Sequence, residues 1–408
     1  MIDRTPGKHA LAFIFITVLV DMIGIGIIIP VLPQLIVDLT DLPLARAALW
    51  GGALTTLYAL MQFVFAPVIG NLSDRFGRRP ILLLCLAGFS LDYLVMGLAP
   101  VLWVLFIGRA LAGLFGATYS TAGAFIADIS PPEKRGANFG LIGAAFGLGF
   151  VIGPVLGGLL GEIDHRLPFF VAAGLAFANL VYGFFILPET HKQENRRPFD
   201  IRKANPVGAL IQMRAYPVVF GLLGAYALFY LGHASLPAVW SYFGMEKFGW
   251  SAFDVGLSLA AVGLTTAAVQ GGLARKLIPL LGAKRAVFIG FSIAVAAYFG
   301  YAFAPTGWSV YVVILLGAFA GIGGPALQGI VSNEVPADSQ GALQGATTSV
   351  MSLMAVIGPG VMTWVFFLFS NREAALYLPG APFAVSGLLT LGAIFVIWRV
   401  IGRRTVTG

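Results

Sequence analysis

Charged residues and cysteine are both scarce in this chain of 408 residues. Only 11% of the residues are charged, whereas a soluble domain usually carries about 25%. Because 58% of the residues are hydrophobic, the folded chain must have lipid as its main solvent. The single cysteine, Cys85, lies inside an apolar run, which excludes a disulfide framework and a cysteine-based metal site.

Motifs of enzymes and of cofactor binding are also missing from the chain. The four histidines are scattered, and we find no Ser-His-Asp constellation, no metal-spaced histidine set and no phosphate loop. The net charge of +7 comes from basic residues in short loops between apolar runs, which is typical of a membrane protein rather than a nucleic-acid partner. The sequence therefore predicts neither an enzyme nor a nucleic-acid-binding protein, and no cofactor or metal.

Long apolar runs are what the chain has in abundance. Only one long polar break, over residues 188–216, interrupts them, and it falls between the sixth run and the seventh. We predict an all-α membrane protein with twelve transmembrane helices in two pseudo-symmetric six-helix bundles, residues 1–187 and 217–408, joined by a cytoplasmic linker over 188–216. The twelve predicted segments lie near residues 9–31, 47–70, 80–99, 101–127, 137–160, 167–187, 217–240, 253–275, 283–303, 308–331, 341–369 and 377–400.

The distribution of lysine and arginine predicts the orientation in the membrane. Twenty basic residues lie at the two termini or in the loops on the same side, and four lie in the opposite loops. Because basic loops stay on the cytoplasmic side, both termini are predicted to be cytoplasmic.

The two halves are related by an internal repeat. Residues 128–140 align with residues 333–345 at a constant offset of 205, and the same offset carries residues 151–154 onto 356–359. Two parallel six-helix repeats of this kind usually build a transporter, with its substrate cavity at the interface of the repeats.

Three ionisable residues, Asp21, Asp92 and Arg109, lie deep inside apolar runs of the first half. An ionised group at that depth costs several kcal/mol unless it is paired or hydrated. One interpretation is a purely structural ion pair. The functional interpretation, which we favour, is that an acid carries a proton across the membrane, Asp21 in the first place and Asp92 in the second, while Arg109 modulates it.

Polar residues inside the apolar runs are candidates for contact with a substrate. They could hydrogen-bond a ligand or merely link helices, and His233, beside aromatic residues, is more often a pocket-lining side chain than a proton carrier. The predicted cavity residues are Tyr58, Gln62, Tyr230, His233, Gln270 and Gln328.

Glycines recur in the fifth apolar run, mostly at four-residue spacing, and a proline follows one of them. Such spacing makes a smooth helix face for close packing, and the proline places a kink in it. We predict a seam of plain helix packing about which the halves can rock. The seam residues are Gly149, Gly153, Pro154, Gly157 and Gly158.

A short basic stretch over residues 70–80 joins the second apolar run to the third, and we predict it to be a turn at the cytoplasmic tip of a helical hairpin. Its Gly, Asp and Arg spacing resembles the signature loop of the major facilitator superfamily. The residues concerned are Gly70, Asp74, Arg75, Gly77, Arg78 and Arg79.

The whole chain resembles the twelve-helix drug/proton antiporters of that superfamily, most closely the tetracycline/proton antiporters. The resemblance implies a secondary transporter that exports an amphipathic organic compound by alternating access, driven by the proton gradient. It further implies a multi-pass monomer in the bacterial inner membrane, and an importer or symporter of a small metabolite is the alternative. The stretches that carry the resemblance are residues 21–33, 58–67, 73–80, 91–93, 147–149 and 325–329.

The resemblance also implies a cytoplasmic gate. In it, Asp74 and Arg78 form a charge cluster with Asp128, and Asp74 faces the N-terminus of the eleventh helix, whose dipole favours an anion. Arg135 belongs to the same gate, together with the residues of the signature stretch. The second half departs from the tetracycline antiporters, since Ala294 and Thr266 stand where that family has an acid and a histidine. This departure leaves the identity of the substrate open.

Overall fold

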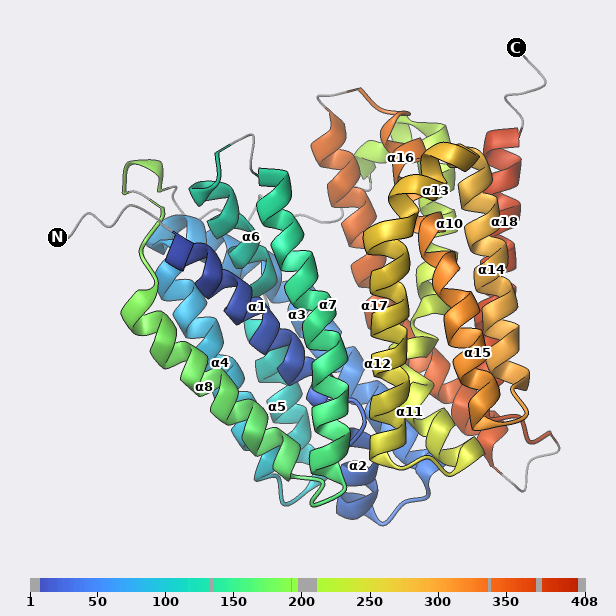
Figure 1. Cartoon of the computed structure of the whole chain (residues 1–408), viewed down its shortest axis with the longest axis horizontal. Helices are drawn as coiled ribbons and strands as arrows, with labels where there is room; N and C mark the ends of the chain where they lie inside the picture. The colour runs from blue at the N-terminus through green and yellow to red at the C-terminus, as the bar shows by residue number, and fades with distance from the viewer. Residues whose placement is uncertain are drawn as a thin grey trace. The chain divides into compact units, whose positions relative to one another are not determined.

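The computed structural model of the chain is helical throughout the part that it describes, residues 8–116, 118–131, 135–191, 193–196, 211–336, 339–371 and 376–402. In these ranges, eleven helical spans are long and apolar enough to cross a membrane. The fourth predicted segment is divided between the shorter helix α5 (Leu102–Phe115) and α6 (Thr118–Ile129). The predicted all-α membrane fold is confirmed (Figure 1).

The chain forms two compact units. The first unit consists of Met1–Pro43, Leu57–Ala204 and Ser251–Ala260, and the second of Leu44–Thr56, Asn205–Trp250 and Ala261–Gly408. The segment Leu44–Thr56 thus packs with helices that come later in the chain, and Ser251–Ala260 packs with earlier ones.

In the first unit, α1 packs against α7 and α8, and α4 packs against α5 and α8 (Figure 1). Its apolar core gathers around Phe13, Leu86 and Phe125, all fully buried. Besides α5 and α6, the helices are α1 (Lys8–Ile28), α2 (Leu32–Thr40), most of α3 (Leu44–Phe76), α4 (Arg78–Gly97), α7 (Arg135–Gly161) and α8 (Leu167–Ile186).

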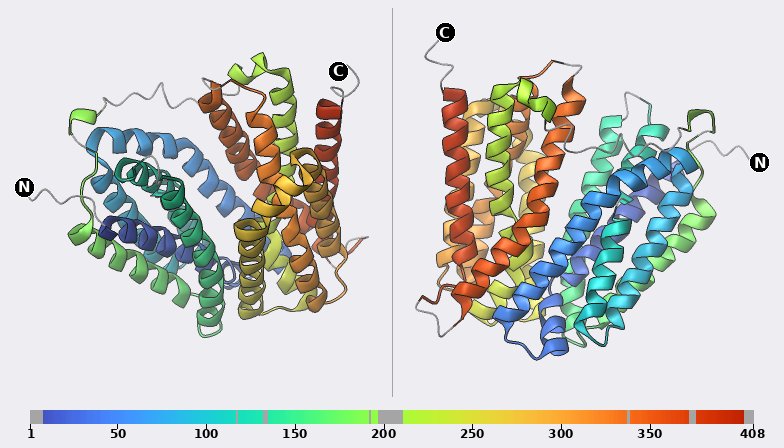
Figure 2. Two further views of the ribbon diagram at one scale, coloured as in Figure 1. Left: turned by 45° about the horizontal axis from the view of Figure 1, so that its top comes forward. Right: turned by 180° about the vertical axis from the view of Figure 1, so that it is seen from behind.

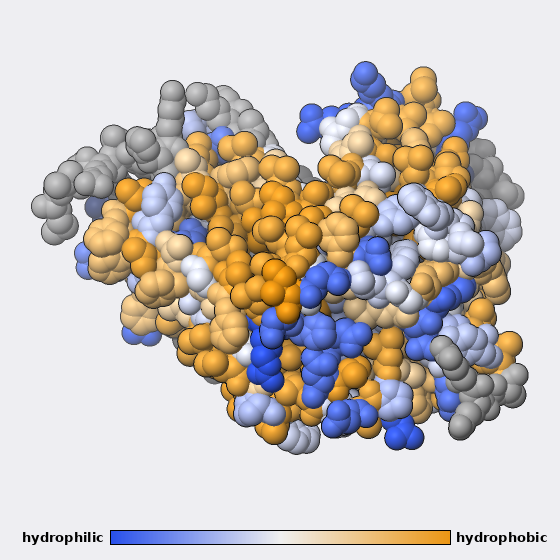
Figure 3. Space-filling view, turned by 60° about the horizontal axis from the view of Figure 1, so that its bottom comes forward, coloured by the Kyte–Doolittle hydropathy of each residue, from blue (hydrophilic) through white to orange (hydrophobic). Residues whose placement is uncertain are grey.

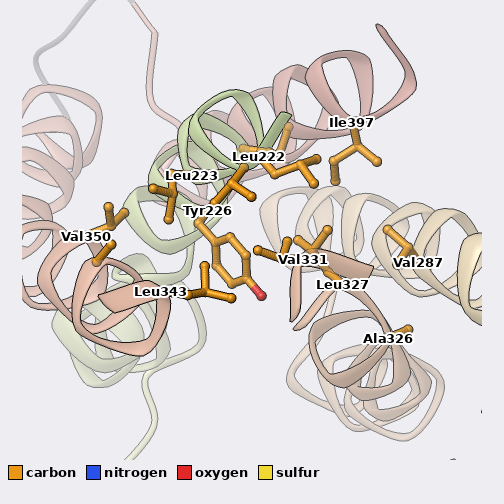
Figure 4. Close-up of a cluster of buried hydrophobic side chains, with 14 of the residues drawn as sticks. Leu222, Leu223, Tyr226, Val287, Ala326, Leu327, Val331, Leu343, Val350 and Ile397 are labelled. Atoms are coloured by element: carbon orange, nitrogen blue, oxygen red, sulfur yellow. The ribbon is translucent and has the colours of Figure 1, made fainter. Parts of the chain in front are cut away.

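In the second unit, α10 lies between α17 and α18 (Figure 2). Leu222, Leu327 and Leu343 from three helices meet in its apolar core (Figure 4). The helices are α10 (Pro217–His233), α11 (Ser235–Phe248), α12 (Ala252–Ala268, which begins in the first unit), α13 (Ala274–Leu281), α14 (Ala283–Phe303), α15 (Gly307–Gly317), α16 (Gly323–Ser332), α17 (Gln340–Ser370) and α18 (Ala381–Gly402).

The internal repeat reappears in the helix boundaries. The offset of 205 residues relates the start of α4 to that of α14, the start of α5 to that of α15, and the start of α7 to that of α17. It also relates the last residue of α1, Ile28, to the last residue of α10, His233. The repeat therefore holds for the backbone as well as for the motifs.

Three features differ from the sequence-based expectation. The basic stretch 70–80, predicted to be a turn, is helical except at Gly77, because Asn71 and Ser73 donate side-chain hydrogen bonds to carbonyls three or four residues earlier and so stay within α3. A short helix, α2, follows the first span, with Pro33 in its first turn. The tenth segment changes to a 3-10 turn over Ala318–Ile322.

Apolar side chains cover much of the surface, as Figure 3 shows for one face. Large exposed examples include Trp308 on α15, Leu264 on α12 and Phe185 on α8. Such an exterior suits contact with lipid and explains the low charge of the chain.

Candidate functional site

The first unit brings together the three ionisable residues that lie deep in its apolar helices. Asp21 on α1 is 7% exposed and Asp92 on α4 is fully buried, while Arg109 lies on α5. Electrostatic interactions join Tyr58 and Tyr93 to all three of them. Residues that are far apart in the sequence thus form one charged cluster in an apolar environment.

Arg109 is held by an aromatic ring rather than by a carboxylate. Its guanidinium lies over the ring of Tyr58, with Cζ 4.4 Å from the ring centroid. Within the described ranges, both carboxylate oxygens of Asp92 lack a hydrogen-bond partner, and so does the Nε of Arg109. A closed ion pair would satisfy these atoms, so the geometry does not match the interpretation of a purely structural ion pair.

Small residues let the helices approach closely around the two acids. A Cβ added at Gly24, on the turn after Asp21, would lie 2.5 Å from the hydroxyl oxygen of Tyr93. A Cβ at Gly108 would lie 2.9 Å from Oδ1 of Asp92. A larger side chain at either glycine would displace the side chain of Tyr93 or Asp92 on α4.

The glycines of α7 pack directly on α1 beside Asp21. A Cβ added at Gly153 would lie 2.7 Å from the carbonyl oxygen of Ile23, and one at Gly149 would lie 2.9 Å from that of Leu19. The contacts are with backbone atoms, which a larger side chain could displace only by moving the whole helix. The predicted seam is therefore a contact between α7 and the turns of α1 on either side of the acid.

At the other end of the seam, α7 packs both on α1 and on the first turns of α12. Gly157 contacts the backbone of α1, and a Cβ added at Gly158 would lie 2.7 Å from the carbonyl oxygen of Ala252. The carbonyl group of Pro154 lies against Gly256. One helix, α7, thus packs closely on two others through adjacent small residues.

Arg78, the first residue of α4, is the centre of a second charge cluster. Its Nη1 donates to Oδ1 of Asp74 at 2.6 Å and to the hydroxyl of Ser73 at 2.5 Å, and its Nε donates to Oδ2 of Asp128 at 3.3 Å. The same oxygen of Asp128 accepts a bond from the hydroxyl of Thr190 at 3.4 Å. The structure thus places Asp74, Arg78 and Asp128 together.

Glu189 is a residue of this cluster that the sequence reasoning missed. Its carboxylate accepts hydrogen bonds from the backbone amides of Arg78, at 2.9 Å, and Arg79, at 3.3 Å, and so caps the N-terminus of α4. It also contacts Gly77, whose φ of 105° lets the chain turn in a single residue. The sequence does contain a signal for this residue, because a proline and an acid directly follow the sixth apolar run.

Gly70, Arg75 and the side chain of Arg79 lie apart from the side-chain contacts of Arg78. A side chain at Gly70 would meet open space, and Arg75 is exposed with its guanidinium 5.1 Å from the ring of Phe76. Arg79 donates to the carbonyl of Phe184 at 2.7 Å. The side chain of Arg135 lies outside the described residues. The predicted approach of Asp74 to the N-terminus of α17 involves both units and stays a prediction.

Two glutamines of the predicted cavity lie at helix breaks that the repeat relates. The amide of Gln62 donates to the carbonyl of Gly116 at 3.0 Å and to the hydroxyl of Tyr58 at 3.3 Å. A Cβ added at Gly321, 205 residues after Gly116, would lie 2.9 Å from Nε2 of Gln270. Each glutamine therefore sits against the glycine where the fourth or the tenth predicted segment leaves regular α-helix.

The other predicted cavity residues belong to the second unit. Gln328 on α16 accepts a hydrogen bond from the hydroxyl of Tyr226 at 2.8 Å. His233, the last residue of α10, lies with Nδ1 3.3 Å from the hydroxyl of Tyr298, and Tyr230 lies one turn earlier. The six predicted residues thus divide between the units, Tyr58 and Gln62 in the first and four in the second.

Known proteins resemble the chain over most of its length. Residues 14–359 match the Major Facilitator Superfamily. The class C tetracycline resistance protein of Escherichia coli is 43% identical over 383 residues, which cover 92% of this chain and 96% of that protein. The class G protein of Vibrio anguillarum is 42% identical, over 83% of this chain and 86% of that protein.

Solved structures show the same fold at lower identity. The crystal structure of a human organic anion transporter aligns with a TM-score of 0.72 and 24% identity, over 97% of this chain and 100% of that one. A nucleoside transporter aligns with a TM-score of 0.76 and 11% identity, over 96% and 99%. The superfamily consists of multi-pass membrane transporters rather than enzymes, as predicted. The chain belongs to the major facilitator superfamily, in the group of the tetracycline resistance proteins.

Proposed function

We propose that the chain is a proton-coupled antiporter that exports an amphipathic organic compound through the bacterial inner membrane by alternating access. Its relatives are named for tetracycline resistance, so a tetracycline is the first compound to test. The division into two six-helix halves, the cytoplasmic termini and monomeric action belong to this proposal.

The observation that carries the proposal is the cluster of Asp21, Asp92 and Arg109. The charged form of a carboxyl group in an apolar helix bundle costs several kcal/mol unless it is paired, and taking up a proton removes that charge. Arg109 is oriented by Tyr58 and is free of a closed salt bridge within the described ranges. A small displacement of α5 can therefore change how strongly its charge favours the ionised form of an acid.

Coupling follows if the proton and the substrate favour opposite states of the transporter. Protonation of Asp21, with Asp92 second, would favour one state, and loading of the substrate would favour the other. The packing of Gly149 and Gly153 on α1 supports this role, because a movement of α7 must be transmitted to the turn that carries Asp21.

The cluster around Arg78 is proposed as the cytoplasmic gate. Its two carboxylate partners come from α3 and α6, so the network ties three helix ends together. Glu189 supports it by holding the amides at the start of α4. A change in these bonds biases the equilibrium between the two states by a few kcal/mol at most, which is enough to shift a population.

Transport by purified protein in proteoliposomes under an imposed pH gradient tests the proposal. We expect gradient-driven tetracycline transport by the wild type and its loss in Asp21→Asn, because asparagine cannot carry the proton. Asp41→Asn is the matched control: Asp41 is exposed and has a φ of 53°, a conformation that asparagine also tolerates.

Equal transport by the wild type and Asp21→Asn would contradict the role of Asp21. Movement of the compound and the proton in the same direction would replace the antiporter with the symporter alternative.

A further inference from the structure

The loop between α7 and α8, residues 162–166, carries an ion pair that neither the proposed proton site nor the proposed gate uses. Nδ1 of His165 lies 2.6 Å from Oδ2 of Asp38, a residue in the last turn of α2. The two side chains are 35% and 48% exposed, so the aqueous medium reaches both of them. We call these two residues the His165–Asp38 pair.

The pair lies at the C-terminus of α2, the end of a helix at which a positive charge is favourable. The last turn of α2 contains no basic residue, and a second acid, Asp41, follows the helix as its C-cap residue. A protonated imidazole beside Asp38 therefore offsets both the carboxylate and the partial negative charge of the helix end. His165 supplies from another part of the chain the cation that α2 itself lacks.

The other charged residues of the loop are bonded to backbone groups. Glu162 accepts a hydrogen bond from the amide of Phe253 at 3.2 Å, and Asp164 accepts one from the amide of Arg166 at 2.7 Å. Nη1 of Arg166 donates to two carbonyls at the end of α4, at 2.7 and 3.1 Å. Histidine is the side chain whose charge ordinarily changes between about pH 5 and 8, so His165 is the residue through which this loop can respond to pH.

The neighbouring helices bring few further charges to the pair. Residues 102–108 of α5 and 138–161 of α7 contain no titratable side chain. Asp254, at the start of α12, accepts a hydrogen bond from the amide of Ser251 at 3.0 Å. Arg46 belongs to the segment of α3 that packs with the second unit. The charges of the first unit at this end are thus mainly negative, and Asp38 is the direct partner of the imidazole.

We propose that the His165–Asp38 pair is a pH-sensitive latch at the end of α2, strong when the imidazole is protonated and weak when it is neutral. A charge-assisted hydrogen bond is about twice as strong as a neutral one, so loss of the proton weakens the contact without abolishing it. The stabilisation is present at acidic pH and falls as the pH rises through the range in which histidine loses its proton.

The latch acts on helices that the transport mechanism uses. The helix α2 begins shortly after α1, which carries Asp21, and Gly161 at the end of α7 packs beside Val31 between α1 and α2. The latch thus fastens the ends of the same two helices that the glycine seam packs together. The inference rests on the proposed function only for its orientation, in which this loop faces the outer medium, the acidic side when a proton gradient drives export.

Hydrogen–deuterium exchange of the full chain in lipid nanodiscs, at about pH 5.5 and about pH 8, tests this inference. The readout is the exchange rate of amides in the last turn of α2, as the ratio of variant to wild type at each pH, which cancels the intrinsic effect of pH. Glutamine can form hydrogen bonds but cannot take up the proton. We expect His165→Gln to raise the ratio about twofold to fivefold at the lower pH and to leave it close to one at the higher pH. In an Asp38→Asn background, His165→Gln should have no further effect.

Arg166→Gln is the matched control in the same loop. It removes a charge that does not titrate in this range, so it should speed exchange at the end of α4 by the same factor at both pH values. His191→Gln removes a histidine elsewhere in the first unit and should leave α2 unchanged.

An equal ratio for His165→Gln at the two pH values, raised or not, would overturn the inference. An effect of His165→Gln that persists in the Asp38→Asn background would do the same, because the partner of the imidazole would then be another group. The measurement needs no substrate and no pH gradient, so failure here is distinguishable from failure of proton coupling at Asp21.

Discussion

Two turns related by the repeat show how the units differ. Gly77 separates α3 from α4, and Gly282, 205 residues later, separates α13 from α14, each in a single residue with positive φ. Around Gly77 lie Glu189 and Arg196, whereas a side chain at Gly282 would meet open space. The two turns share their backbone conformation, but among the described residues charged side chains surround only the turn at Gly77.

The same contrast holds deeper in the helices. The first unit carries Asp21, Asp92 and Arg109, whereas the residues at the offset of 205 in the second unit are the uncharged Tyr226, Ala297 and Ile314. The seam differs as well: Gly149 and Gly157 correspond to Met354 and Met362 at the same offset. One scaffold thus carries buried charged groups in one unit and uncharged residues at the corresponding positions of the other.

The largest effect on transport is expected from replacing Arg109, a charged residue of the first unit. We expect Arg109→Ala to reduce gradient-driven transport at least about a hundredfold, because one partner of a buried charge cluster is lost and the remaining charges are uncompensated. Arg109→Lys should restore only part of it, since an ammonium cannot stack on Tyr58 as the planar guanidinium does.

The measurement is initial rate in proteoliposomes, with Arg46→Ala as control because Arg46 is exposed near the start of α3. Transport by Arg109→Ala at the wild-type rate would show that gradient-driven transport does not depend on the charge of Arg109.

The next largest effect is expected from a substitution in the glycine seam of α7. In Gly157→Ala the new methyl group would meet the backbone of Ile27, so we expect a loss of about 1–3 kcal/mol of stability and slower transport. Gly147→Ala, in the same helix but facing open space, should be neutral or slightly stabilising. Thermal unfolding in detergent compares the two variants. Equal melting temperatures would show that α7 does not depend on this close contact with α1.

The paired turns offer a direct test of the comparison. Gly282 combines a φ of 76° with a ψ of 146°, a conformation essentially restricted to glycine, so Gly282→Ala should be destabilised by about 1–3 kcal/mol. Gly77→Ala should lose more, because its methyl group would also displace Glu189 from the amides of α4. The same thermal assay measures both, and equal losses would mean that the Glu189 cap contributes nothing to stability.

The smallest effect on stability is expected at Asp74, whose counterpart at the offset of 205 is Pro279. Asp74 is 41% exposed in its bond to Arg78, and such pairs contribute about 0–1 kcal/mol. We therefore expect Asp74→Asn to leave stability and substrate binding nearly unchanged but to slow turnover several-fold. Normal turnover, measured as transport per protein at saturating substrate, would argue against a gate at this position.

Much of the fold could be predicted from local sequence. Apolar run lengths predicted the spans, and the offset of 205 that relates the sequence motifs also relates the helix boundaries. Stretch 70–80 was misjudged as a turn because its polar residues suggest a loop, whereas in α3 they bond back to their own helix. Glu189 was missed for a similar reason: its partners lie more than a hundred residues earlier in the chain.

The lipid environment, the repeat and the buried acids could be recognised without any structure, because they depend on hydrophobicity and charge read residue by residue. The folded arrangement of the helices was needed to show that Arg109 lies over Tyr58, that Gly153 meets Ile23, and that Phe229 of α10 stacks on Phe291 of α14. Each of these contacts joins different helices. Their geometry depends on how closely the helices pack and how each is rotated about its axis, which no local pattern specifies.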